Sequence, residues 1–125
     1  MAKLPAIAAT SLLLVTSVLA QNSAVSCETL DDGIEKIKCT FVTQRKNIQR
    51  EVTFQWHSES HPQDDRERSI ALPANHGSVY DYRYLRGRAP GIWNVSVTLT
   101  DADGNEETVS HHFLLEGNKI INEKK

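Results

Sequence analysis

The chain has 125 residues, and its 14 lysines and arginines against 16 aspartates and glutamates give a net charge of −2 at pH 7. This length allows one domain with a modest core. The slight acidity argues against nucleic acid as the partner, because phosphate contacts need grouped cations.

Residues 1–20 resemble a secretory signal peptide. A single lysine precedes an apolar run over about residues 6–20, which is shorter than a membrane span and ends in small residues. We expect cleavage after Ala20, although a short N-terminal anchor is the alternative. A β domain over 21–116 and a polar tail over 117–125 would follow, with no membrane span. The mature protein would be secreted, or periplasmic if the source is bacterial.

The first segment of the mature chain predicts a hairpin with a disulfide. The sequence "VSCETLDDGIEKIKCTF" is nearly symmetric about Gly33, so a turn there places Val25 opposite Phe41 and Cys27 opposite Cys39. Directly opposed residues lie at a separation that a disulfide can bridge, and a secreted chain favours the oxidised state. A metal or redox pair is less favoured, since there is no CxxC and no histidine nearby.

Polar and apolar residues alternate through most of the following chain, which is typical of strands in antiparallel sheets. We expect Trp56 and Trp93 to anchor the core. The pattern predicts an all-β fold, a small immunoglobulin-like antiparallel β-sandwich of about seven strands with one disulfide. The expected strands are residues 24–30, 34–43, 50–57, 69–72, 78–85, 92–100 and 107–115.

Three tyrosines alternate along the strand expected at 78–85, at positions 80, 82 and 84. The opposite face carries Asp81 and Arg83 and is poorer core material, so we expect the tyrosines to face the core. The alternative is an outward aromatic platform for a sugar or a protein. In either case the strand end and its turn, with Tyr84, Arg86 and Arg88, are the candidate partner-binding residues. The loop from His57 to Arg68 is the second choice.

The segment "GIWNVSVTLTDADGNEETVSHHFLL", residues 91–115, resembles the final strand pair of immunoglobulin-like β-sandwiches of the PKD kind. The shared pattern is Gly, aromatic, x, Val, x, Val, then Asp-x-x-Gly and an alternating strand. The resemblance covers about the last third of the chain, and small secreted domains of unknown function share it. It implies an adhesive, spacer or ligand-docking role rather than an enzymatic one.

The turn "DADGNE" offers oxygen ligands at alternate positions, as a calcium loop would. However, its glycine is fourth rather than sixth, and His112 occupies the place of the twelfth-position glutamate. An Asp-Gly pair between alternating strands predicts a hairpin turn, because glycine accepts positive φ. We therefore favour the turn over weak calcium binding.

Asn94 begins the triplet Asn-Val-Ser, an N-glycosylation acceptor if the source is eukaryotic, on a face expected to meet solvent. His57, His61 and His112 could form a copper or zinc site if the strands of His57 and His112 were adjacent. Surface histidines that bind no metal are the simpler interpretation.

No catalytic motif is present, and no cofactor is expected. We expect a secreted, non-enzymatic binding module for a protein or surface-glycan partner, and a small effector of a host-associated microbe would be one such case. The alternative is an extracytoplasmic copper- or zinc-binding protein that uses its histidines.

Overall fold

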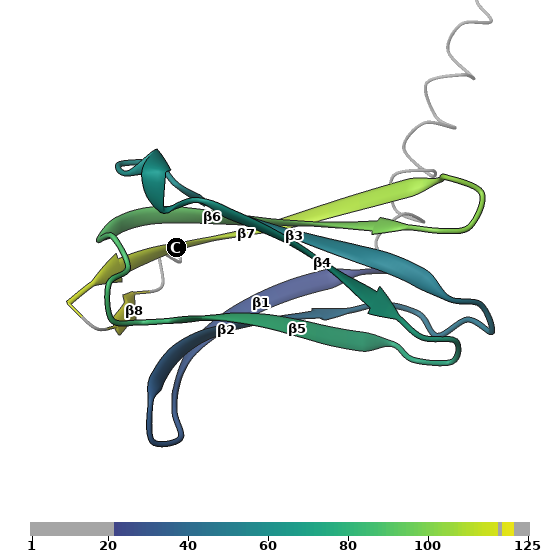
Figure 1. The fold of residues 1–125 in the computed structure, drawn as a ribbon, viewed down its shortest axis with the longest axis horizontal. Coiled ribbons are helices and arrows are strands. Elements are labelled where there is room, and N and C mark those ends of the chain that lie inside the picture. Colours follow the sequence, from purple (N-terminus) through teal and green to yellow (C-terminus); the bar gives the residue numbers. More distant parts are fainter. Residues whose placement is uncertain (1–21, 118, 122–125) are drawn as a thin grey trace, which may run out of the picture.

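The computed structural model of the chain describes residues 22–117 and 119–121. The expected signal peptide at 1–20 lies outside these residues, with its cleavage site after Ala20. Within the described part, eight strands form two antiparallel sheets that pack face to face, in the orders β1-β2-β5 and β4-β3-β6-β7-β8 (Figure 1). The elements are β1 (Ala24–Asp31), β2 (Glu35–Val42), β3 (Arg50–Ser58), the short 3₁₀ helix η1 (Pro62–Asp64), β4 (Arg66–Leu72), β5 (Ser78–Tyr84), β6 (Gly91–Thr100), β7 (Glu106–Glu116) and β8 (Lys119–Ile121).

The hairpin of β1 and β2 has the predicted register and the predicted disulfide. Cys27 pairs directly with Cys39, and their sulfur atoms are bonded. The turn closes at Gly33, whose φ of 112° suits glycine, and the Gly33 N–H donates to Asp31 Oδ1 at 3.1 Å. The disulfide therefore fixes the pairing of the two strands that carry it.

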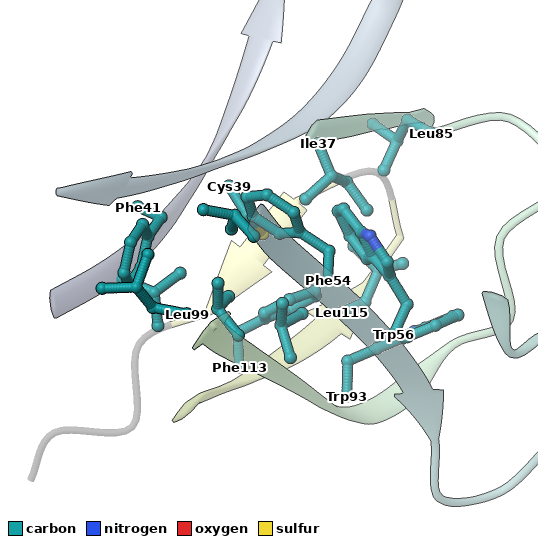
Figure 2. Close-up of a cluster of buried hydrophobic side chains, with 14 of the residues drawn as sticks. Ile37, Cys39, Phe41, Phe54, Trp56, Leu85, Trp93, Leu99, Phe113 and Leu115 are labelled. Carbon is teal, nitrogen blue, oxygen red and sulfur yellow. The ribbon is translucent and has the colours of Figure 1, made fainter. Parts of the chain in front are cut away.

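The middle strands of the larger sheet, β3, β6 and β7, supply most of the core. Trp93 on β6 pairs with Phe113 on β7, and their rings stack with centroids 6.4 Å apart. Trp56 on β3 meets Trp93 edge-on, also at 6.4 Å, and both tryptophans are buried as expected. The smaller sheet closes this core from the other side (Figure 2) with inward residues that include Ile37, Cys39 and Phe41.

These features confirm the predicted fold class, an all-β antiparallel sandwich with one disulfide, and the described residues form eight strands where about seven were expected. One strand begins well before the residue that the sequence pattern indicated. β4 begins at Arg66 and not at residue 69, because its first residues pair with the end of β3, with Arg66 opposite Trp56. The charged run that the pattern assigned to a loop is therefore part of an edge strand.

Residues 119–121, which we expected in a polar tail over 117–125, form the short strand β8. Gly117 has a φ of 63° and turns the chain back, so that β8 pairs with the end of β7. Ile120 lies opposite Leu115 and packs against the core. Burial of this one isoleucine, together with the glycine turn, explains why the sandwich extends beyond the expected boundary.

Candidate binding surface

The tyrosines of β5 face solvent, which overturns the prediction that they form core. Tyr80 is 52% exposed and Tyr84 is 51% exposed, whereas Asp81 and Arg83 point inward and are buried. The prediction failed because it judged Asp81 and Arg83 as isolated polar residues. In the folded chain Asp81 finds hydrogen-bond partners on β3 and β4, and Arg83 finds one in η1. A satisfied buried polar group of this kind is tolerated.

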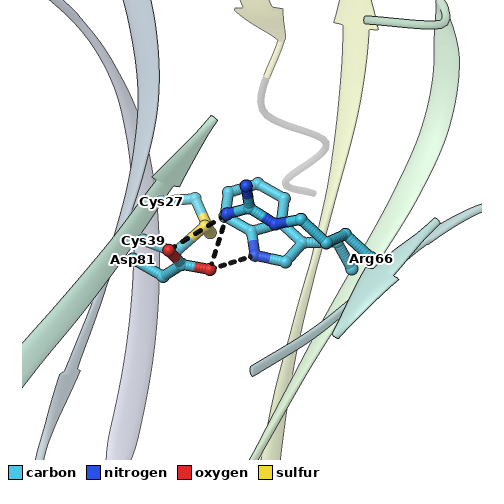
Figure 3. The surroundings of a disulfide bond; sticks show 5 residues. Cys27, Cys39, Arg66 and Asp81 are labelled. Carbon is cyan, nitrogen blue, oxygen red and sulfur yellow. Dashed lines mark hydrogen bonds and ion pairs between the residues drawn. A yellow bond between two sulfur atoms is a disulfide. The ribbon is translucent and has the colours of Figure 1, made fainter. Parts of the chain in front are cut away.

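The Asp81 carboxylate lies between the two sheets, next to the disulfide (Figure 3). It accepts hydrogen bonds from Trp56 Nε1 at 2.9 Å and from Arg66 Nη2 at 3.0 and 3.1 Å. Arg68 Nη1 adds a longer contact at 3.4 Å, and Arg66 Nη2 also donates to the carbonyl oxygen of Tyr82 at 2.9 Å. Two arginines of β4, an edge strand of the larger sheet, therefore reach Asp81 on β5, an edge strand of the smaller sheet.

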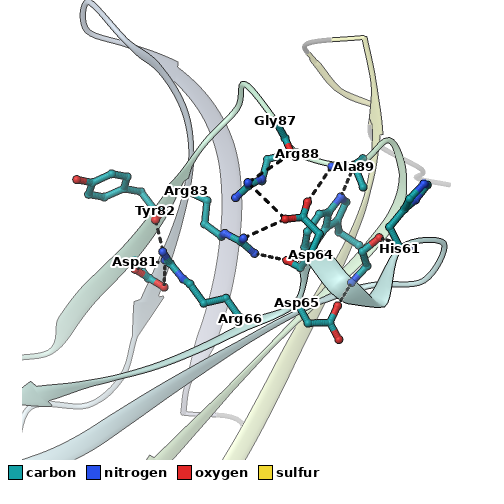
Figure 4. A network of polar contacts seen from close by, with 12 residues as sticks. His61, Asp64, Asp65, Arg66, Asp81, Tyr82, Arg83, Gly87, Arg88 and Ala89 are labelled. Atoms are coloured by element: carbon teal, nitrogen blue, oxygen red, sulfur yellow. Dashed lines mark hydrogen bonds and ion pairs between the residues drawn. The ribbon is translucent and has the colours of Figure 1, made fainter.

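A second carboxylate, Asp64 at the end of η1, ties the loop after β5 to the loop after β3 (Figure 4). Arg83 donates to its backbone oxygen at 2.7 Å and to Oδ1 at 3.2 Å. The Ala89 N–H donates to Oδ2 at 2.9 Å, and Arg88 Nη2 lies 3.4 Å from Oδ1. These contacts hold Arg83 and Arg88 side by side at one end of the sandwich.

Arg83 is also enclosed by aromatic rings. Its guanidinium carbon lies 5.8 Å from the centroid of Trp56 and 5.7 Å from that of Trp93. Burial lowers the pKa of Arg83, and the positive charge of Arg88 lowers it further, against the opposing effect of Asp64. The arginine remains charged, because an arginine pKa starts far above neutrality.

The arginines from β4, β5 and the loop after β5 surround a cleft of about 170 Å³. Its four guanidinium groups contact two carboxylates, Asp64 and Asp81. We call this hollow the arginine cleft, and its lining residues are Arg66, Arg68, Tyr82, Arg83, Tyr84 and Arg88.

The outer side of the smaller sheet adjoins the cleft and forms what we call the tyrosine face, composed of Tyr80, Tyr82, Tyr84, Lys36 and Lys38. Lys38 Nζ lies 4.4 Å from the ring centroid of Tyr80, and Lys36 Nζ lies 4.8 Å from that of Tyr82. The rings of Tyr82 and Tyr84 are 5.9 Å apart. Cation–π contacts of this kind hold the rings in place while leaving them accessible.

The structure divides the predicted partner-binding residues between two hollows. Tyr84 and Arg88 line the arginine cleft, whereas Arg86 lines a separate hollow near the β1–β2 turn. The sequence pattern missed Arg66 and Arg68, because they appeared to belong to a loop. Their alternation would have placed them on one strand face if the start of β4 had been recognised.

The loop from His57 to Arg68, the second-choice surface, is held by side-chain hydrogen bonds. Asp65 accepts from the Ser58 N–H at 2.8 Å and lies 2.7 Å from His57 Nδ1. Partial burial raises the pKa of Asp65, but the hydrogen bonds with His57 and Ser58 outweigh it, so the pKa is lowered. The loop thereby places Asp64 beside Arg83 and Arg88.

The three histidines considered as metal ligands do not converge. His57 and His112 each pair with Asn94, so β6 separates their strands and the required adjacency is not met. His61 Nδ1 lies 2.8 Å from the hydroxyl of Ser60. Among residues 22–117 and 119–121, no group of three or more histidine, cysteine or acidic side chains is arranged to hold a metal ion.

The "DADGNE" segment forms the predicted hairpin turn between β6 and β7. Asp101 Oδ1 accepts hydrogen bonds from the N–H groups of Asp103 and Asn105 at 2.9 and 3.0 Å. These bonds, above all the one from Asn105, lower the pKa of Asp101. Gly104 takes a φ of 87°. The carboxylate proposed as a calcium ligand thus organises the turn itself.

Asn94 lies on the outer side of the larger sheet, on a middle strand and half-buried. Its Oδ1 is enclosed and has no hydrogen-bond partner within the described part of the chain. Glycosylation at this residue stays a prediction.

Comparison of the chain with family models, curated proteins and solved structures finds no match. The resemblance to the PKD kind of sandwich therefore rests on the residues of the last hairpin. In the part of the chain that is described, no helix is long and apolar enough to cross a membrane.

Proposed function

We propose that this chain is a secreted, non-enzymatic binding module that recognises a partner through the tyrosine face and the adjoining arginine cleft. The observation that carries the proposal is the outward orientation of the β5 tyrosines, with Tyr80 and Tyr84 each about half exposed. Secretion is inferred from the apolar leader at 1–20 and supported by the disulfide, which persists in oxidising compartments.

Rigid, half-exposed aromatic side chains are well suited to recognition. Tyrosine offers a large contact area with few rotatable bonds, and little conformational entropy is lost when a partner covers it. Here the rings stand on a strand that is hydrogen-bonded to β2, and lysines pack against them. Arginine and tyrosine are also the residue types that contribute most at protein interfaces. The partner class is a protein or a surface glycan.

The experiment compares Tyr80→Thr/Tyr84→Thr with a matched control, Ile92→Thr. Ile92 is a 40% exposed apolar residue on β6, in the other sheet. Labelled mature protein is titrated onto an array of immobilised glycans and onto intact cell surfaces. We expect the tyrosine variant to lose at least tenfold in apparent affinity, with its melting temperature little changed, because hot-spot aromatics contribute about 2 kcal/mol or more.

The control should bind as the wild type does, because its strand lies in the opposite sheet. Equal affinity of the wild type and the tyrosine variant would refute the tyrosine face as the recognition surface. Equal loss in the control would show that nonspecific exposure of apolar side chains explains the binding.

A further inference from the structure

The arginine cleft has more positive charge than its carboxylates neutralise. Four guanidinium groups line it, and the acidic groups in contact with them are Asp64 and Asp81. The chain as a whole has a net charge of −2, so this excess is local and is not a consequence of a basic protein. Such a local field favours an anionic ligand at this position.

Several guanidinium donors of the cleft remain free for a ligand. Arginine has five N–H donors. The side chain of Arg68 is 54% exposed, and within the described residues it makes one hydrogen bond, at the long distance of 3.4 Å. The guanidinium of Arg66 bonds through Nη2 alone, which leaves its Nη1 without a hydrogen-bond partner in the same set of residues. Planar guanidinium groups of this kind match the geometry of a carboxylate or sulfate.

The walls of the cleft suit a sugar better than a peptide strand. Tyr82 and Tyr84 contribute aromatic rings on which the apolar side of a sugar can pack. A peptide that extended the sheet would need to hydrogen-bond to the free edge of β5. At this edge the carbonyl oxygen of Tyr82 already accepts a hydrogen bond from Arg66. The volume of about 170 Å³ leaves room for one acidic group and the edge of its ring.

We propose that the arginine cleft binds the carboxylate or sulfate group of an acidic glycan, with Arg68 and Arg88 contacting the anion and Tyr84 contacting the sugar ring. The inference deepens the proposed function and rests on it, because it assumes that the exposed tyrosines take part in recognition. Arg83, which is 8% exposed and bonded to Asp64, forms the fixed base of the site.

The test uses the oxidised mature protein and four probes, which are heparin, polygalacturonate, uncharged dextran and a tyrosine-sulfated peptide. The key comparison is Arg88→Gln against Arg86→Gln. Both variants lose one positive charge from the same loop, but Arg86 lies outside the cleft. We expect binding to heparin or polygalacturonate and none to dextran. Arg88→Gln should weaken this binding about tenfold or more, because it removes a charge-assisted hydrogen bond to the anion. Arg86→Gln should leave the binding nearly unchanged.

Arg68→Gln serves as a second variant, because its exposed side chain can be changed without disturbing the fold, and the same loss is expected. Equal weakening by Arg86→Gln would mean diffuse charge attraction and would overturn the cleft. Preference for the sulfated peptide would replace the glycan with a protein ligand, and binding of none of the charged probes would exclude the site. If any of these three outcomes is found while attachment to cells still depends on the tyrosines, the proposed binding function is retained. Only the acidic glycan as the ligand of the cleft is then refuted.

Discussion

The hydrogen bond between Asp81 and Trp56 provides a direct measure of how the core accommodates a buried charge. Asp81→Leu removes the acceptor and leaves Trp56 Nε1–H, in a side chain that is 1% exposed, without a partner. An unmade buried hydrogen bond costs about 1–3 kcal/mol. Arg66 and Arg68 lose the same carboxylate, but their side chains are 37% and 54% exposed and can turn to water, which adds less than about 1 kcal/mol each.

Asp81→Leu should therefore lower the free energy of unfolding by about 1–5 kcal/mol. Trp56→Phe should also destabilise, since it shrinks a core residue and removes the donor. In the double variant neither donor nor acceptor remains, so the unpaired N–H of the first single variant is gone. The double variant should be more stable than the sum of the two single losses indicates, by about 1–3 kcal/mol.

Urea unfolding of the four oxidised proteins measures this coupling as shifts in the midpoint at constant slope. A matched control pairs Asp81→Leu with Trp93→Phe, because the indole N–H of Trp93 donates to the Ala89 carbonyl oxygen and not to Asp81. The control cycle should be additive within about 0.5 kcal/mol. If the Trp56 cycle were equally additive, the buried hydrogen bond would contribute nothing and the reasoning would fail.

Three further perturbations test other parts of the fold. Cys27→Ala/Cys39→Ala should cost about 3 kcal/mol in urea unfolding, from the lost constraint on the unfolded chain. Unchanged stability would contradict it. The pKa of Asp65 is lowered below 3.8, chiefly by His57, so its ionised form stabilises above pH 3.8 and this stabilisation is lost as the pH falls through and below that value. Asp65→Asn should thus lose less stability on acidification, by under about 1 kcal/mol, and an identical pH profile would argue against the pair. Gly104→Ala should cost about 1 kcal/mol, because φ is 87° and no steric clash adds to it. Calcium should not alter the melting temperature of either the wild type or this variant, and a rise with calcium would restore the metal loop.

Local patterns were sufficient wherever neighbouring segments pair with each other. The symmetry about Gly33 gave the register of Cys27 and Cys39, since a hairpin register depends on the turn alone. The Asp-Gly pair at Gly104 likewise gave the β6–β7 turn. In both cases the information lies within a few residues of the turn that uses it.

The orientation of β5 could not be obtained in this way. Alternation defines two faces of a strand but does not state which face is inside, and the choice depends on distant partners. Asp81 is satisfied by Trp56 and Arg66, and Arg83 by Asp64, all at least 15 residues away in the chain. The separation of His57 from His112 is a similar case, because it follows from strand order, which no local pattern contains.

The arrangement around Asp81 links the core to the proposed binding surface. A buried ion pair seldom adds net stability, and an apolar replacement of its members is often neutral. Stability alone therefore does not explain why a carboxylate occupies this inward position. The effect of Asp81 on Arg66 provides an explanation. Asp81 holds the guanidinium of Arg66 between the edge strands β4 and β5, where Arg66 also covers the edge of β5. Asp64 acts on Arg83 in the same manner. The two carboxylates thus fix the inner arginines of the cleft, so that a ligand would need to order only the outer ones, which reduces the entropic cost of binding.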